Sequence, residues 1–85
     1  MVDAESAKSL TLFTRQRCSL CEHLALALDL LRIRYRFDYT KIDVDTDPAL
    51  TERYGMRVPV LVDQGREVCA GRCDPETVEA YITAS

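Results

Sequence analysis

A short apolar segment followed almost at once by a long amphipathic one is the feature that most limits how this chain can fold. Residues 9–14, SLTLFT, alternate in polarity and are rich in Thr, Leu and Phe, which predicts a buried strand. From Ser19 to about Arg32, apolar residues recur at helical spacing, which predicts a helix. Leu26, Leu30 and Ile33 widen that stripe, so we expect the helix to be covered on two sides.

The remainder of the chain continues the alternation of strands and helices. The expected elements are a strand over 35–45, a short helix from Pro48 to Tyr54 with Asp47 as its N-cap, a strand over 58–63, a turn over 64–67, a strand over 68–70 and a helix that opens at Asp74-Pro75. The order is β-α-β-α-β-β-α. The two β-α units favour parallel pairing of the first two strands, and the tight last turn predicts an antiparallel hairpin.

Length, charge and hydropathy limit the class of protein. Eighty-five residues make one small domain, and we expect residues 1–8 to be a flexible tail and 9–85 to be the folded domain. A net charge of -3 without a Lys/Arg cluster argues against nucleic-acid binding. No apolar stretch is long enough to span a membrane, and the acidic start MVDAESAKS does not resemble a secretory signal. We therefore expect a cytoplasmic protein, in which cysteines are seldom structural disulfides.

Cys18 and Cys21 form a C-x-x-C motif at the predicted start of the first helix. A helix N-terminus favours a negative charge, so this placement is expected to lower the pKa of the Cys18 thiol, with help from Arg15 and Arg17 if they point inward. Cys21 lies one helical turn further, where its thiol can attack a mixed disulfide formed on Cys18. The β-α-β setting favours reversible redox chemistry over a zinc site.

Two further cysteines, Cys69 and Cys73, leave alternatives open. A structural zinc needs four ligands in a closed site, and the C-x3-C spacing of this pair, with one member in a strand, is a poor match. Cys73 could instead be a third redox thiol or a site of glutathionylation. Because free cysteines are among the most buried residue types, we expect packing to explain both, and we expect no metal.

The combination of CSLC after the first strand, VP before the third and AGRCD before the last helix resembles the glutaredoxin-like members of the thioredoxin superfamily. The resemblance covers about residues 9–83 and implies an α/β thioredoxin-like fold, a four-stranded mixed sheet of order 2-1-3-4 flanked by three helices. It also implies a cis Val58-Pro59 bond beside Cys18. Cys18 would be the nucleophile, Cys21 the resolving thiol, and the backbone of Val58 would pair with the substrate cysteine.

The glutathione-binding part of the resemblance is less complete. Glutaredoxins usually have a Gly-Gly pair followed by Asp, where this chain has Gly71, Arg72 and Asp74. The Asp74 carboxylate could hold the γ-glutamyl end of glutathione, although Asp is also a natural helix N-cap. Arg57 stands where Thr is common. The forked side chains of Arg57 and Arg72 could hold glutathione carboxylates, or both could be solvated.

These observations predict a glutaredoxin-like thiol-disulfide oxidoreductase. The expected substrates are a disulfide-containing protein or a glutathione mixed disulfide, recognised by Val58 and by the apolar surface around Leu20 and Pro59. No bound cofactor is needed; glutathione is a possible co-substrate, and glutathione or a thioredoxin-reductase-type enzyme would return the electrons. We expect a monomer that binds neither nucleic acid nor membrane. Two alternatives stay open: a glutaredoxin-like protein that binds a metal or an iron-sulfur cluster, and a redox-inert interaction module.

Overall fold

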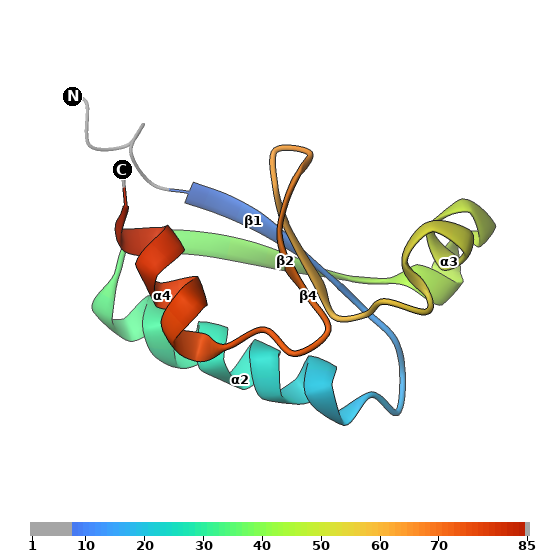
Figure 1. Ribbon diagram of the computed structural model, residues 1–85, viewed down its shortest axis with the longest axis horizontal. Coiled ribbons are helices and arrows are strands. Elements are labelled where there is room, and N and C mark those ends of the chain that lie inside the picture. Colours follow the sequence, from blue (N-terminus) through green and yellow to red (C-terminus); the bar gives the residue numbers. More distant parts are fainter. Residues whose placement is uncertain (1–7, 85) are drawn as a thin grey trace.

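The computed structural model describes residues 8–84, which form the elements labelled in Figure 1. They are β1 (Lys8–Thr14), α2 (Ser19–Arg34), β2 (Phe37–Asp43), a 3-10 helix η1 (Val44–Thr46), α3 (Pro48–Tyr54), β3 (Val60–Asp63), β4 (Arg66–Ala70) and α4 (Pro75–Thr83). Of the predicted tail, residues 1–7 lie outside the described residues, as does residue 85 of the predicted domain. Lys8 was assigned to the tail but begins β1.

The second strand is shorter than the predicted span of 35–45. It ends at Asp43, whose carboxylate accepts a hydrogen bond of 2.9 Å from the backbone N–H of Asp45. This local bond offers the backbone an alternative to the strand ladder, and η1 begins at Val44. α3 begins at Pro48 and ends at Tyr54 as predicted, with the Asp47 carboxylate accepting from a backbone N–H of its first turn.

The hairpin between β3 and β4 has a tighter turn than predicted. Only two residues connect the strands, Gln64 with φ 52° and Gly65 with φ 82°. Positive φ at both central positions matches the right-handed twist of the two antiparallel strands that the turn joins. Glycine adopts such a φ without steric cost. β4 therefore starts at Arg66 instead of residue 68, while β3 starts at Val60 instead of residue 58.

The sheet has the order β2-β1-β3-β4, the order that the resemblance implies. β1 pairs with β2 in parallel from Lys8 opposite Phe37 to Thr14 opposite Asp43. β3 runs antiparallel to both β1 and β4. The parallel pairing of the first two strands and the antiparallel hairpin of the last two are thus confirmed, and with them the α/β thioredoxin-like fold.

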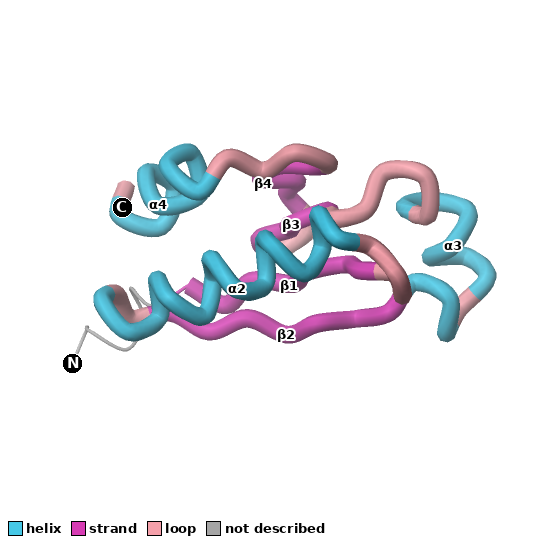
Figure 2. The backbone as a smooth tube through the Cα atoms, turned by 90° about the horizontal axis from the view of Figure 1, so that it is seen from below, coloured by secondary structure: helices cyan, strands magenta, loops and turns pink. Residues whose placement is uncertain are grey.

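Two helices cover one face of this sheet, and the third lies at its end. α2 and α4 lie side by side against the strands, while α3 lies beyond the end of β2 (Figures 1 and 2). The core between the helices and the sheet consists of Leu10, Leu12, Leu24, Ala25, Leu28, Leu31, Phe37, Leu61, Val78 and Ile82. The ring of Tyr54 in α3 stacks on Phe13 of β1 with centroids 4.3 Å apart.

One apolar stripe of α2 is exposed, contrary to our prediction that the helix is covered on two sides. Leu26 and Leu30 are 59% and 57% exposed, and Ile33 is 80% exposed. α4 packs through Val78 and Ile82 into the core between the helices and the sheet, and it does not cover this stripe. Between residues 8 and 84, no helix combines the length and the apolar character required to cross a membrane.

We predict that Leu28→Ala lowers the free energy of unfolding by about 2–5 kcal/mol, because Leu28 is completely buried and its removal leaves a cavity. Leu30→Ala is the matched control, since Leu30 lies on the exposed stripe, and its effect should stay within about 0.5 kcal/mol. Urea denaturation followed by circular dichroism measures both. If both variants lost the same free energy of unfolding, the face of α2 that packs on the sheet would differ from the one described.

Candidate active site

Cys18 is the N-cap residue of α2. Its backbone is extended, its carbonyl accepts from the N–H of Glu22 at 3.1 Å, and its Sγ accepts from the backbone N–H of Cys21 at 3.1 Å. The sulfur therefore faces the N–H of Cys21 in the first helical turn, whose N–H groups have no partner inside the helix. A thiolate at this position would be stabilised by those donors and by the positive end of the helix dipole.

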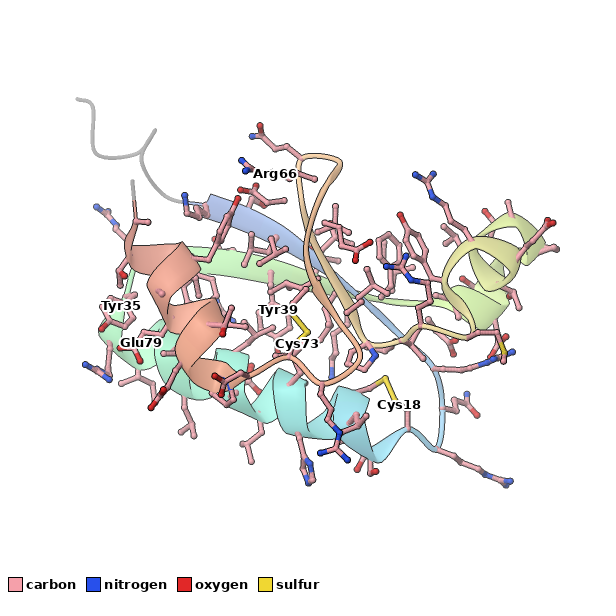
Figure 3. All side chains as sticks on the ribbon, in the orientation of Figure 1. Cys18, Tyr35, Tyr39, Arg66, Cys73 and Glu79 are labelled. Atoms are coloured by element: carbon pink, nitrogen blue, oxygen red, sulfur yellow. A yellow bond between two sulfur atoms is a disulfide. The ribbon has the colours of Figure 1, made fainter. Side chains whose placement is uncertain are left out.

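Cys18 and Cys21 are joined by a disulfide, with their Cα atoms 5.2 Å apart. Cys18 is partly exposed at the N-terminal end of α2 (Figure 3), whereas Cys21 is only 3% exposed. This difference arises because Cys21 lies on the buried side of α2, and Cys18 lies before its first turn. An incoming sulfur can therefore reach Cys18 but not Cys21.

The two arginines before the motif were expected to lower the pKa of Cys18 only if they point inward, and Arg15 is bound elsewhere. The Arg15 guanidinium donates to both carboxylate oxygens of Asp45, at 2.9 and 3.1 Å, and to the carbonyl of Gly55 at 3.1 Å. The hydrogen bond from Arg15 lowers the pKa of Asp45. Arg15 thus ties the loop before Cys18 to η1 and to the end of α3, and Arg17 is exposed in a turn with φ 57°.

The Val58-Pro59 peptide bond is cis, as the resemblance implies. The Pro59 side chain is completely buried, so Leu20, which is 38% exposed, contributes the accessible part of the predicted apolar surface. Val58 is half-buried, and within residues 8–84 its backbone makes no hydrogen bond. The carbonyl of Pro59 accepts from the N–H of Gly71 at 2.8 Å, which ties the loop before α4 to the proline.

An open pocket of about 410 Å³ lies between α2 and this loop. It is lined by Leu20, His23, Leu24, Gly71, Arg72, Cys73, Asp74 and Pro75. Asp74 and Arg72 bring opposite charges to one wall, and Leu20 connects the pocket with the cysteine motif. The pocket can therefore hold an extended polar ligand that carries both an ammonium and a carboxylate group.

The structure brings only part of the predicted substrate-binding set together. Asp74 is the N-cap of α4 by position, but its carboxylate makes no capping bond to the helix. Among residues 8–84 it accepts only from the Thr77 hydroxyl, at 3.4 Å. Arg57 is held by Glu67 at 2.6 Å and is absent from the described lining of the pocket. Arg72 lines it instead. The pocket thus combines Asp74 with Arg72 and leaves Arg57 outside.

Cys69 and Cys73 form a second disulfide, with Cα atoms 5.6 Å apart, so the prediction that both are free, packed thiols is wrong. Both do pack against the core. The sequence signal for the pairing was the C-x3-C spacing, in which Gly71, with φ 71°, lets the chain turn back at the end of β4. Within the part of the chain that the structure describes, no three His, Cys, Asp or Glu side chains are placed to hold a metal ion.

The fold, the C-x-x-C motif at a helix start and the cis proline before β3 define a thioredoxin-fold protein of the glutaredoxin-like class. Residues 9–83 match the family described as "Glutaredoxin-like domain (DUF836)", and the chain belongs to this family. It is also similar to the uncharacterized protein Rv0508 of Mycobacterium tuberculosis, with 33% identity over 85 residues. The match covers 94% of this chain and 88% of that protein.

Solved structures show the same fold. A protein from Nitrosomonas europaea has a TM-score of 0.77 at 30% identity, covering 91% of this chain and 93% of its own. A structural genomics target from X. campestris has a TM-score of 0.72 at 38% identity, covering 89% and 97%. A mutant thioredoxin from Halobacterium salinarum has a TM-score of 0.65 at 30% identity, covering 95% and 76%.

The pair of Arg15 and Asp45 predicts how stability changes in acid. Because the pKa of Asp45 is lowered in the folded protein, the pair stabilises the fold at pH values above the ordinary carboxyl pKa. This contribution disappears as the pH falls through the lowered value. Asp45→Asn should therefore be less stable than the natural chain at pH 7, and the difference should shrink toward pH 2. Urea denaturation across this range measures it, and a difference independent of pH would contradict the assignment.

Proposed function

We propose that the protein is a thiol-disulfide oxidoreductase whose redox centre is the Cys18–Cys21 pair. The observation that carries the proposal is the position of Cys18, which caps α2 with its Sγ toward a backbone N–H while bonded to Cys21. A thiolate is the nucleophile in disulfide exchange, and a helix N-terminus stabilises a thiolate at neutral pH. The burial of Cys21 supports different roles for the two thiols.

In the first step the Cys18 thiolate attacks one sulfur of a substrate disulfide. A new bond forms between Cys18 Sγ and that sulfur, the substrate S–S bond breaks, and the other substrate sulfur leaves as a thiolate that takes up a proton. In the second step the Cys21 thiol loses its proton and attacks Cys18 Sγ. The second substrate sulfur then leaves as a thiol. Two electrons have passed from the dithiol to the substrate, and the Cys18–Cys21 disulfide remains.

The free backbone groups of Val58 support its proposed role in holding the substrate. A peptide segment that carries the disulfide would pair with the N–H and C=O of Val58, in the manner of an added strand. Leu20, exposed next to the motif, would contact an apolar residue of that segment. Such recognition depends on the backbone more than on side chains, so it would admit several protein substrates.

The pocket beside Leu20 supports glutathione as co-substrate. Glutathione carries an ammonium group and two carboxylates, and the pocket offers the Asp74 carboxylate and the Arg72 guanidinium. Asp74 is free to accept an ammonium group because it makes no capping bond to α4. Glutathione, or a thioredoxin-reductase-type enzyme, would return two electrons to the pair. A reducing compartment such as the cytoplasm supplies both, and there the protein would contribute to redox homeostasis.

The redox couple is tested by equilibrating the protein in glutathione buffers and counting free thiols by alkylation and mass spectrometry. We expect a reversible two-electron transition of the Cys18–Cys21 pair with a midpoint between about -270 and -120 mV. Peptide mapping assigns the thiols to this pair. A pair that stays oxidised, or stays reduced, across all buffers would end the proposal.

The roles of the two thiols are separated by matched serine variants. Cys21→Ser should accumulate a glutathione mixed disulfide on Cys18, because the resolving thiol is missing. Cys18→Ser should accumulate little adduct on Cys21, because Cys21 is 3% exposed. Peptide mapping by mass spectrometry after incubation with oxidised glutathione gives both values and separates them from any adduct on Cys69 or Cys73. Equal adduct formation on the two cysteines would contradict the assigned roles.

The contribution of Asp74 is tested with a glutathionylated peptide as substrate. Asp74→Asn should raise the KM by about tenfold or more, since a hydrogen bond to a charged group contributes about 1.5–3 kcal/mol. Glu76→Gln is the control, because Glu76 is also exposed and lies in the first turn of the same helix. A rise of the same size in both variants would indicate a general charge effect, and Asp74 would then have no specific role.

A further inference from the structure

The second disulfide closes a very short loop. Cys69 is near the end of β4 and Cys73 lies before α4, only four positions further along the chain. A cross-link stabilises a fold mainly by restricting the unfolded chain, and this effect is smallest for short loops. Residues 69–73 are moreover already held by the pairing of Cys69 with Leu61 and by the bond from Gly71 to Pro59. Stabilisation of the fold is therefore a weak explanation for this disulfide.

The two sulfur-bearing residues have different surroundings. Cys73 lines the pocket between α2 and the loop, together with His23 and Arg72. Cys69 comes from the sheet, where it pairs with the completely buried Leu61. Figure 3 shows Cys73 on the loop above the middle of α2, with Cys18 at the start of the helix further to the right. A small thiol that enters the pocket would therefore meet Cys73 first.

Arg72 places a positive charge beside Cys73, which favours the binding of an anionic thiol. Arg72 is exposed and, among the described residues, has no ion-pair partner. Its cation lies next to Cys73 in the sequence and on the same pocket wall. A thiolate that carries further carboxylates would be attracted to this wall, and the same cation would stabilise the negative charge shared by the sulfurs during exchange. Asp74 offsets part of this charge, and it also offers a partner for an ammonium group.

We propose that the Cys69–Cys73 disulfide is a second thiol-disulfide exchange site, at which a small anionic thiol of the glutathione type attacks Cys73. The thiolate bonds to Cys73 Sγ, the Cys69–Cys73 bond breaks, and Cys69 leaves as a thiolate that takes up a proton. A second small thiol, losing its proton, attacks the sulfur of the bound one. The Cys73 thiolate leaves and is protonated. Two small thiols have become one disulfide, and the protein pair has become two thiols.

This site does not depend on the Cys18–Cys21 couple proposed above. It adds a covalent state within the pocket, since a small thiol bonded to Cys73 would occupy the space next to Leu20 and His23. The loop that changes its covalent state also carries Gly71, whose N–H is bonded to the carbonyl of Pro59. The redox state of the Cys69–Cys73 pair would thus alter the loop that borders the proposed Cys18–Cys21 site.

The test uses the full chain with Cys18→Ser and Cys21→Ser, so that only the second pair can respond. The variant is equilibrated in buffers of reduced and oxidised glutathione, alkylated and mapped by mass spectrometry, with circular dichroism to confirm folding. We expect Cys69 and Cys73 to gain their thiols together in a reversible two-electron transition while the protein stays folded. A pair that remains bonded in the most reducing buffer, or is never bonded in the most oxidising one, overturns the proposal.

The direction of attack is tested by removing one further cysteine. With Cys69→Ser added, oxidised glutathione should form an adduct on Cys73, and with Cys73→Ser added the adduct on Cys69 should form at least tenfold more slowly. Equal rates would overturn the assignment of Cys73 as the attacked sulfur. If a variant fails to fold, peptide mapping of the natural chain, trapped early in reduction by glutathione, identifies the cysteine that carries glutathione.

The role of Arg72 is tested in the same background. Arg72→Gln should slow the reduction of the second pair by glutathione about threefold to fivefold, the effect expected of one nearby exposed charge. Raising the salt concentration should reduce this difference. Arg66→Gln is the control, because Arg66 lies at the tip of the β3-β4 hairpin, away from the loop (Figure 3). Equal rates for all three proteins would show that Arg72 does not attract the thiol.

Discussion

The burial of one face of α2 against the sheet decides where Cys18 lies. Leu24, Leu28 and Leu31 of α2 pack on Leu10 and Leu12 of β1, and burying such side chains contributes about 1.5–3 kcal/mol each. Because β1 and α2 are joined by only four residues, a helix fixed on the sheet must begin at the end of β1. The N-terminal N–H groups then face Cys18, while Cys21 turns toward the core.

A second constraint fixes the loop before α4. The hydrogen bond from Gly71 to Pro59 holds the loop before α4 beside the proline, and the Cys69–Cys73 disulfide limits the path of the same loop. The pocket that results lies between α2, at whose start the first disulfide lies, and a loop that carries Cys73 of the second. Family membership and the solved relatives agree with the fold. The chemistry proposed for the protein rests on the burial of Cys21 in the first pair and on the place of Cys73 beside Arg72 in the second.

Much of this arrangement could be predicted because it depends on local signals. Asp47 and Pro48 marked the start of α3 correctly, since capping and a fixed φ act within a few residues. The turn after Asp63 was predicted in the right place but two residues too long, and the starts of its two strands were wrong while their ends were right. Where a strand starts depends on the partner strand. The covering of Leu30 was predicted wrongly, because periodicity shows which residues of a helix are apolar and not which of them another element will cover.

The sequence by itself determined the order of strands and helices and the place of Cys18 at a helix start, because hydrophobic periodicity and capping are properties of neighbouring residues. Together with the resemblance it also indicated the cis Val58-Pro59 bond. Only the tertiary structure decided that Cys69 bonds to Cys73, that Arg15 is bound to Asp45, and that Arg72 lines the pocket while Arg57 does not. These are contacts whose partners depend on how the loops are positioned, and that follows from packing of the whole chain.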